Sequence, residues 1–274
     1  MADKPETITW IVGAPRSGTH LINSLVCTGE GCGPFVPEFH SVDSAIVAWK
    51  SVQRAFVTQR YFFESKEEMD AFYRGHIGAL VDSAWRNLGM PRHLVLKHCM
   101  LTPLIPELLI HFPEWRYVVV IRDPKDVIAS EIRVWKKDHS RETFDPSLIE
   151  KLTHQYLGYY KPLIKGEMLH DTRVIGVEYE NIVAQKFGDL EKFLGYAIHP
   201  DKVWSSDRFD IGVEYQGIRG ASEQWGKEMT GSRVASFGEI LYPFDAEQIT
   251  QSTSAITSQF RKLAQEANSK RQAA

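Results

Sequence analysis

Near its N-terminus the chain reads ITWIVGAPRSGTHLINSLV over residues 8–26. The apolar run at residues 8–12 is typical of a buried strand, and apolar residues recur at helical spacing over residues 21–26. Between them, residues 13–19 contain two glycines, which indicate a tight loop. The stretch therefore predicts a strand, a tight loop and a helix in direct succession.

The same alternation of strand and helix continues along the chain. Further strands are predicted at residues 93–97, 116–122 and 173–177, and helices at 42–60, 66–89, 103–111, from about 124, at 185–194 and at 245–267. Such alternation implies a mainly parallel sheet whose ligands bind at the carboxyl ends of the strands. The predicted fold class is α/β: a single domain over residues 1–274, with a central, mainly parallel sheet flanked by helices in a phosphate-loop, nucleotide-kinase-like architecture. The polar tail after about residue 264 is expected to fray.

Composition limits the classes of protein to which the chain can belong. The 274 residues carry a net charge of −3, so an anion site has to be built locally and nucleic acid is not an expected partner. No apolar run approaches the roughly 20 residues that cross a bilayer. We also find no export signal and no N-x-[ST] sequon, which favours a cytoplasmic protein. The three cysteines have the spacing of neither a disulfide framework nor a zinc site.

The loop at residues 13–19 has the chemistry of an anion site. A glycine-rich turn before a helix presents several backbone N–H groups to one point, and the helix N-terminus adds partial positive charge. Arg16, Ser17 and Thr19 lie in this loop, where polar side chains have little to do unless they meet a charged ligand. Thr19, and not lysine, follows Gly18, which argues against magnesium-dependent hydrolysis of a triphosphate. The plainer interpretation is that the glycines only serve a tight turn.

Four segments resemble signatures of the PAPS-dependent sulfotransferases, whose sulfuryl donor is 3′-phosphoadenosine 5′-phosphosulfate (PAPS). Residues 15–20, PRSGTH, resemble the loop that holds the 5′-phosphosulfate. Residues 118–130, VVVIRDPKDVIAS, resemble the strand and helix that hold the 3′-phosphate. Residues 219–225, RGASEQW, resemble the late loop that closes over this phosphate, and residues 174–195 resemble the segment whose tyrosine approaches the nucleotide.

The resemblance implies transfer of a sulfuryl group from PAPS to a hydroxyl or amine of a small-molecule or carbohydrate acceptor. In-line displacement would leave 3′-phosphoadenosine 5′-phosphate (PAP). Nucleotide binding is assigned to the loop at 13–20, to the motif at 118–130 and to the closing loop at 217–227. The implied binding residues are Pro15, Arg16, Ser17, Gly18, Thr19, His20, Arg122, Ser130, Tyr179, Arg219 and Gly220.

Two details of the implied nucleotide site stay open. An arginine at a strand end and a serine two turns into the next helix can converge on one phosphate, but Arg122 also has the spacing for a helix-capping ion pair with Asp126. Leu21 stands where cytosolic members of the family use tryptophan against adenine. Phe209 is a candidate for that stacking role.

Sulfuryl transfer needs in-line geometry and stabilisation of the charge that builds on the bridging oxygen. Arg16 is placed for that charge, and the resemblance adds Lys97 at the end of a predicted strand. The alternative is that Lys97 is an exposed lysine at a strand end.

The acceptor also needs a general base, and Glu38 is the first choice. Residues 32–40 resemble a loop of bacterial carbohydrate sulfotransferases in which a glutamate takes the acceptor's proton. Pro34 and Pro37 stiffen this loop, and partial desolvation is expected to raise the pKa of Glu38. The plain alternative is a solvated loop glutamate.

Two histidines are further candidates for the base. His40 serves either as base or as a residue that orients the substrate. His98 is less favoured because Cys99 occupies the histidine position of the cytosolic enzymes. If the strand continues, His98 faces its opposite side. No metal is expected, since the histidines and acidic residues show no ligand spacing such as H-E-x-x-H.

The acceptor is not defined by the sequence. Trp49, Phe56 and Phe63 recur at seven-residue intervals and are expected either to form one apolar face over the acceptor or to belong to the core. A kinase of a small metabolite and a nucleotide-binding protein without activity are the alternative functions. A homodimer is compatible with the sequence.

Overall fold

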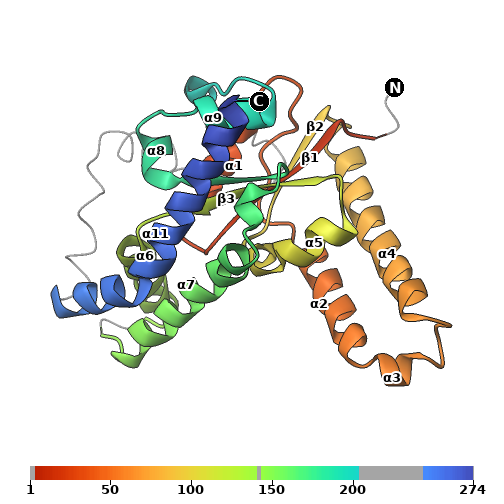
Figure 1. The fold of residues 1–274 in the computed structure, drawn as a ribbon, viewed down its shortest axis with the longest axis horizontal. Helices are drawn as coiled ribbons and strands as arrows, with labels where there is room; N and C mark the ends of the chain where they lie inside the picture. Colours follow the sequence, from red (N-terminus) through yellow and green to blue (C-terminus); the bar gives the residue numbers. More distant parts are fainter. Residues whose placement is uncertain (1–3, 141–142, 204–242, 274) are drawn as a thin grey trace.

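The protein is built on a four-stranded parallel sheet with the strand order β2-β1-β3-β4. The computed structural model describes residues 4–140, 143–203 and 243–273. The strands are β1 (Thr7–Gly13), β2 (His93–Lys97), β3 (Trp115–Ile121) and β4 (Val174–Glu178). Because β1 pairs with β2 on one side and β3 on the other, the loop after β1 lies where the chain changes direction across the sheet, the usual ligand position in such folds. The expected fold class, an α/β fold with a central parallel sheet, is confirmed (Figure 1).

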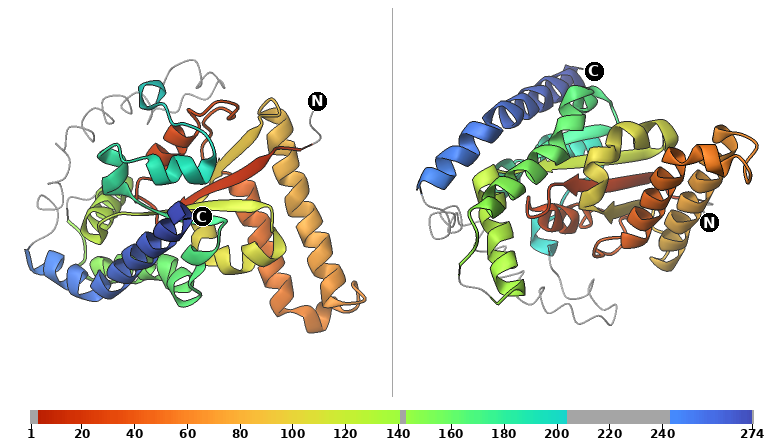
Figure 2. Two further views of the ribbon diagram at one scale, coloured as in Figure 1. Left: turned by 45° about the horizontal axis from the view of Figure 1, so that its top comes forward. Right: turned by 90° about the horizontal axis from the view of Figure 1, so that it is seen from below.

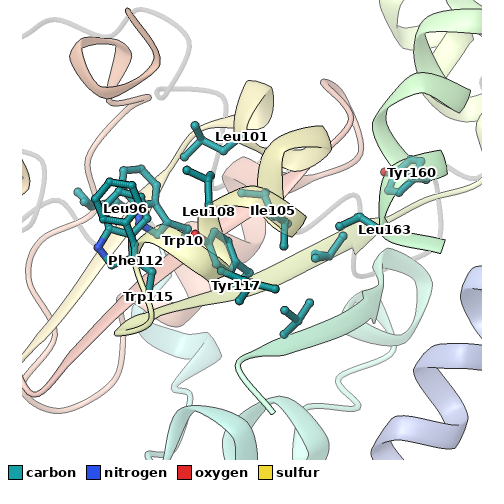
Figure 3. Close-up of a cluster of buried hydrophobic side chains, with 14 of the residues drawn as sticks. Trp10, Leu96, Leu101, Ile105, Leu108, Phe112, Trp115, Tyr117, Tyr160 and Leu163 are labelled. Carbon is teal, nitrogen blue, oxygen red and sulfur yellow. The ribbon is translucent and has the colours of Figure 1, made fainter. Parts of the chain in front are cut away.

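Both faces of the sheet are buried, which explains the continuous apolar runs of its strands. Successive side chains of a strand point to opposite faces. Trp10 and Val12 therefore join the core on one face, while Ile11 between them joins the core on the other. Figure 3 shows part of the first core, where Phe112 and Trp115 stack with ring centroids 4.0 Å apart.

Helices cover the sheet on both sides (Figures 1 and 2). The second face is covered by α1 (Thr19–Val26), α8 (Tyr179–Val183) and α9 (Gly188–Leu194). The first is covered by α2 (His40–Arg54), α4 (Lys66–Asn87), α5 (Ile105–His111), α6 (Pro124–Asp138), α7 (Ser147–Lys165) and α11 (Pro243–Ala273). Short elements complete the described chain: α3 (Phe56–Gln59) and the 3-10 helices Cys99–Leu104, Met168–His170 and Pro200–Lys202.

The predicted strands agree with the observed ones to within one or two residues, but the helices differ more from expectation. Helices α7 and α8 have no counterpart among the predicted elements. The expectation that the tail frays after residue 264 is wrong, since α11 continues to Ala273. Ala264 and Ala267 are buried, and Arg271 donates a hydrogen bond to the carbonyl of Asp171 at 3.0 Å. Contacts with β4 and α7 hold this polar helix in place.

Helices α2, α3 and α4 form a hairpin that projects from the body of the protein (Figures 1 and 2). The expected apolar face of Trp49, Phe56 and Phe63 does not form. Trp49 is fully buried, and its indole donates to Asp70 at 2.7 Å, whereas Phe63 packs against Phe72 with ring centroids 5.8 Å apart. Trp49 therefore belongs to the core. No helix among the described residues is both long and apolar enough to cross a membrane.

The contact between β4 and α11 can be tested at Gly176. A Cβ atom there would lie 2.9 Å from the Cβ of Ala264 and 3.1 Å from the ring of Phe260. We expect Gly176→Ala to lower the free energy of unfolding by roughly 1–3 kcal/mol, because overpacking forces α11 away from the sheet. Urea unfolding followed by circular dichroism would measure this loss.

Gly158 in α7 is the matched control, because a Cβ there meets nothing within 4 Å. Gly158→Ala should raise the free energy of unfolding by roughly 0.5–1 kcal/mol, since alanine loses less backbone entropy in a helix. Equal stability of Gly176→Ala and the wild type would show that α11 does not pack on β4 as described.

Candidate active site

Four predicted site residues lie at the carboxyl ends of the four strands. Arg16 follows β1, Lys97 ends β2, Arg122 follows β3 and Tyr179 follows β4. Because the strands are parallel, these ends share one edge of the sheet, and that edge becomes lined with cationic and aromatic side chains.

The first turn of the loop after β1 is held by distant hydroxyl groups. The backbone N–H of Gly13 donates to Thr102 Oγ1 at 2.8 Å, and that of Ala14 donates to the hydroxyl of Tyr160 at 3.1 Å. Tyr160 in turn donates to the carbonyl of Val120 on β3 at 2.8 Å. The start of the loop is thus fixed, and its remaining N–H groups can be directed to a ligand.

The second glycine of the loop allows a close approach by Tyr179. Gly18 has φ 95°, and a Cβ atom there would lie 2.3 Å from the Tyr179 ring. Gly18 is also the N-cap of α1, whose end receives no side-chain capping bond and has no acidic residue in its first turn. The N-terminus of α1 therefore keeps the partial positive charge that favours an anion.

The two predicted phosphate-binding segments meet in the structure. Arg16 Nε donates to Ser130 Oγ at 3.1 Å, which joins the loop after β1 to helix α6. The guanidinium of Arg122 lies 4.4 Å from the ring centroid of Tyr179 and forms the anticipated ion pair with Asp126 at 3.6 Å. Arg122 Nε is buried and has no hydrogen-bond partner among the described residues. This arginine therefore retains a donor for an anion despite its ion pair.

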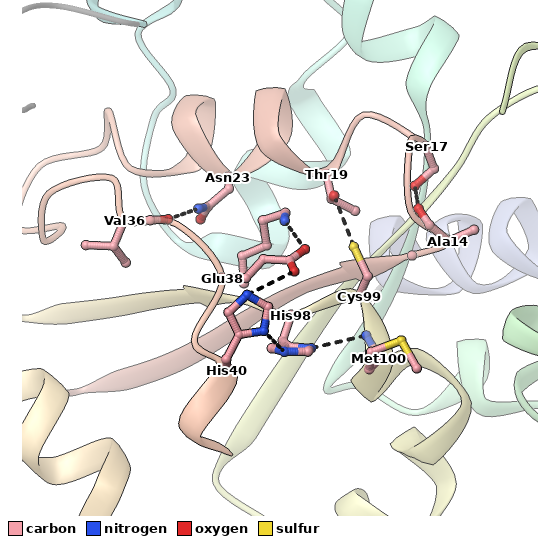
Figure 4. A network of polar contacts seen from close by, with 12 residues as sticks. Ala14, Ser17, Thr19, Asn23, Val36, Glu38, His40, His98, Cys99 and Met100 are labelled. Carbon is pink, nitrogen blue, oxygen red and sulfur yellow. Dashed lines mark hydrogen bonds and ion pairs between the residues drawn. The ribbon is translucent and has the colours of Figure 1, made fainter. Parts of the chain in front are cut away.

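Glu38 lies near the end of β2, where its carboxylate forms an ion pair with Lys97 Nζ (Figure 4). The Lys97 side chain is fully buried, so the alternative of an exposed strand-end lysine is excluded. Burial acts to raise the pKa of Glu38, but the hydrogen bond and the charge of Lys97 outweigh it and hold that pKa below its usual range. The expectation of a raised pKa is therefore wrong, because the sequence did not reveal the buried lysine partner.

The two histidines form a chain that leads to Glu38 (Figure 4). The backbone N–H of Met100 donates to His98 Nδ1 at 3.2 Å, so the neutral His98 ring carries its proton on Nε2. That Nε2 lies 3.2 Å from His40 Nδ1, and His40 Nε2 lies 3.8 Å from Glu38 Oε2. His98 does not face away from this group as expected, because the loop at residues 35–40 folds over the end of β2. Its ring lone pair is occupied, which leaves it unsuited to act as base.

One group of side chains in the described part of the chain has atoms close enough to share a metal ion. Nitrogen or oxygen atoms of Glu38, His40 and His98 lie within 4.8 Å of one another. Histidines that bind metals usually donate their second ring N–H to an acceptor. His98 instead accepts a hydrogen bond at Nδ1, so its neutral tautomer presents a proton and not a lone pair to this cluster. The arrangement fits a hydrogen-bonded chain better than a metal centre.

His20 and Cys99 fill the space between the loop and the end of β2. Cys99 Sγ lies 3.5 Å from Thr19 Oγ1, and burial raises the pKa of the thiol to about 11. The pKa of His20 is lowered to about 4, first by burial and then by the charge of Lys97. Both groups are therefore neutral near neutral pH.

A sequence profile of the sulfotransferase family matches residues 9–200. The chain belongs to the sulfotransferase family. The profile covers all four strand ends, and it favours sulfuryl transfer over the alternative of a metabolite kinase.

Solved sulfotransferase structures share this fold. A sulfotransferase domain from the Synechococcus PCC 7002 olefin synthase superimposes with a TM-score of 0.54 at 17% identity, covering 92% of this chain and 96% of that one. A domain from the curacin biosynthetic pathway gives 0.53 at 17% identity, covering 92% and 99%. Mouse sulfotransferase SULT7A1 complexed with PAP gives 0.53 at 13% identity, covering 96% and 90%. No curated protein sequence matches the chain.

The structure of this sulfotransferase adds residues that the sequence did not indicate. Thr102 and Tyr160 hold the loop at residues 13–19, the predicted phosphate loop, although they lie 89 and 146 residues from the groups they bind. No local signal therefore marks them. Some predicted residues lie outside the described part of the chain: Arg219 and Gly220 of the closing loop 217–227, and Phe209.

The support of the phosphate loop by Tyr160 predicts a stability effect. Tyr160→Phe removes the acceptor of the Ala14 N–H and the donor to Val120, all of them buried. We expect a loss of about 1–3 kcal/mol in the free energy of unfolding, because buried polar groups lose their partners. Tyr159→Phe is the control, since its hydroxyl donates to Met100 Sδ, a weak acceptor, and to no other group in the described part of the chain. Equal losses in the two variants by urea unfolding would contradict the role of Tyr160.

Because the buried His20 is neutral, we expect the stability of the folded protein to fall in acid. Between pH 6.5 and pH 4 the unfolded chain binds a proton at His20 that the folded protein excludes. Stability therefore falls as the pH falls through this window, by at most about 1.4 kcal/mol per pH unit. His20→Gln should flatten this decline in unfolding free energy, whereas His154→Gln, at an exposed position of α7, should not. Parallel declines in all three proteins would contradict the burial of a neutral His20.

Proposed function

We propose that this sulfotransferase moves a sulfuryl group from PAPS to a hydroxyl or amine of a small-molecule or carbohydrate acceptor by in-line displacement. The observation that carries the proposal is the meeting of the two predicted phosphate-binding segments, with Arg16 bonded to Ser130 and Arg122 over Tyr179. A donor with phosphates at both its 5′ and 3′ positions needs such a paired site, whereas a single phosphate needs only the loop.

The residues at the strand ends fit the two ends of this nucleotide. The loop of Pro15, Arg16, Ser17, Gly18, Thr19 and His20 would hold the 5′-phosphosulfate at the N-terminus of α1. Arg122 and Ser130 would hold the 3′-phosphate, and the Nε of Arg122, which has no partner in the ranges that the structure describes, supplies a donor for it. Arg219 and Gly220 are proposed to close over the same phosphate. A PAP complex of the structurally similar mouse enzyme supports this choice of donor.

The side chains around the sulfuryl position have different roles in the proposed reaction. PAPS, when bound, supplies the sulfuryl group and a phosphate leaving group. The sulfur–oxygen bond to that phosphate breaks as the acceptor's oxygen or nitrogen bonds to sulfur. Arg16 and Lys97 stabilise the charge that builds on the leaving phosphate. The carboxylate of Glu38 accepts the acceptor's proton.

His40 is the second candidate for the base. Its Nδ1 lies 3.2 Å from His98 Nε2, which places a ring N–H, and not a lone pair, toward Glu38. This arrangement favours Glu38 as the base and His40 as a residue that orients it.

Calorimetric titration with PAP in the presence of a chelator tests the donor site. We expect micromolar binding of PAP that ATP does not match. Arg122→Ala should weaken PAP binding by about 10-fold to 100-fold, because a hydrogen bond to a charged group contributes about 1.5–3 kcal/mol. Arg133→Ala is the matched control, since Arg133 lies on the same helix and is exposed.

Tighter binding of ATP with magnesium than of PAP would overturn the donor assignment and favour the kinase. Equal PAP affinities of the wild type and Arg122→Ala would exclude Arg122 from the site. A screen of hydroxyl and amine acceptors with labelled PAPS would follow a positive result.

A further inference from the structure

Lys97 is paired with one anionic group and, in the proposed function, serves a second. Its ammonium group is fully buried and paired with the Glu38 carboxylate. In the proposed function the same ammonium stabilises the leaving phosphate of the donor. A compact point charge on a flexible stem can move between two such partners. The proton affinity of Glu38 therefore depends on whether the Lys97 ammonium lies beside its carboxylate or beside the donor.

We propose that Lys97 is a latch on the general base: donor binding draws its ammonium from Glu38 toward the phosphosulfate and thereby frees the carboxylate to accept the acceptor's proton. The latch rests on the proposed function, because it needs a donor anion in the phosphate loop. Glu38 is then held as an unreactive ion pair until the donor arrives.

The position of Lys97 favours this exchange of partners. Lys97 pairs with Ile11 across β2 and β1, two residues before the phosphate loop begins. Cys99 follows Lys97 by two residues and contacts Thr19 at the start of α1. The charge of Lys97 also acts on the ring of His20, a residue of the loop itself. The ammonium is thus placed between the loop that would hold the donor and the segment that carries Glu38.

The loop of Glu38 is held firmly enough that the lysine, and not the carboxylate, has to move. Asn23 Nδ2 donates to the carbonyl of Val36 at 3.1 Å (Figure 4). The backbone N–H of Phe39 donates to the carbonyl of Lys97 at 3.1 Å. These bonds lie on both sides of Glu38. The long side chain of Lys97 is the flexible member of the pair.

The other groups that face Glu38 cannot replace the charge of Lys97. The His98 and His20 rings are buried and their pKa values are lowered, so both are neutral. Cys99 is a thiol whose pKa is raised by burial, and Tyr159 on α7 likewise stays neutral. His40 is exposed and lies 3.8 Å away. When Lys97 leaves, the burial of Glu38 prevails and raises its proton affinity.

The latch predicts proton uptake on nucleotide binding, which calorimetry can measure. PAP is the probe, because its 5′-phosphate terminates where the bridging oxygen of the donor would stand. The titration is run at about pH 6 in buffers that differ in ionisation enthalpy, so that the slope of the binding enthalpy gives the number of protons bound. We expect the wild type to take up more protons than Glu38→Gln, by up to about one per nucleotide.

Further variants separate the latch from a general disturbance of the site. Lys97→Met should lose the extra uptake, because Glu38 then lacks its partner both with and without PAP. Removing one member of a buried pair can prevent folding, whereas replacing both is often tolerated. The double variant Glu38→Gln/Lys97→Met is therefore included and should also lack the extra uptake. Asp43→Asn, on the first turn of α2, should retain it.

The outcomes distinguish the latch from the donor site on which it rests. PAP binding with equal proton uptake in the wild type and the double variant would overturn the latch and leave the donor site intact. Absence of PAP binding to the wild type would overturn the donor assignment, and the latch with it. Extra proton uptake that requires Glu38 and Lys97 would support the latch and the donor site together.

Discussion

The hydroxyl group of Tyr160 connects the parts of the protein on which the active site depends. It accepts a hydrogen bond from the N–H of Ala14 in the phosphate loop and donates one to the carbonyl of Val120 on the neighbouring strand. A loop that offers its backbone N–H groups to an anion cannot satisfy them internally, so its first turn needs partners from elsewhere. Tyr160 and Thr102 provide these partners from α7 and from the 3-10 helix after β2. The predicted anion site therefore depends on the folded protein.

The parallel sheet adds the second constraint, which is the placement of charge. A chain with a net charge of −3 has no general attraction for a bisphosphate. Because all four strands run in the same direction, Arg16, Lys97 and Arg122 converge at one edge, where Lys97 pairs with Glu38 and Arg122 with Asp126. The buried ion pair of Lys97 and Glu38 lies at this same edge. In the proposed function, donor recognition and acceptor activation would then share Lys97.

The sequence predicted the sheet well because its strands are continuous apolar runs buried on both faces. It predicted the ends of α11 and the environment of Glu38 poorly. The end of α11 is polar, and it stays helical only because Ala264 and Ala267 pack on the body and Arg271 bonds to a carbonyl. The pKa of Glu38 is lowered by a lysine 59 residues away, and no local pattern could indicate that pair.

By itself the sequence determined the strand, glycine loop and helix of residues 8–26, the α/β class and the family-like motifs that mark Arg16, Arg122 and Ser130. These features depend on local backbone geometry and on periodic burial, which neighbouring residues encode. The tertiary structure alone decided that Arg16 meets Ser130, that Tyr179 packs on Gly18 and that His98 reaches Glu38 through His40. These contacts join residues far apart in the chain, and their energies depend on burial that exists only after the sheet and its helices have assembled.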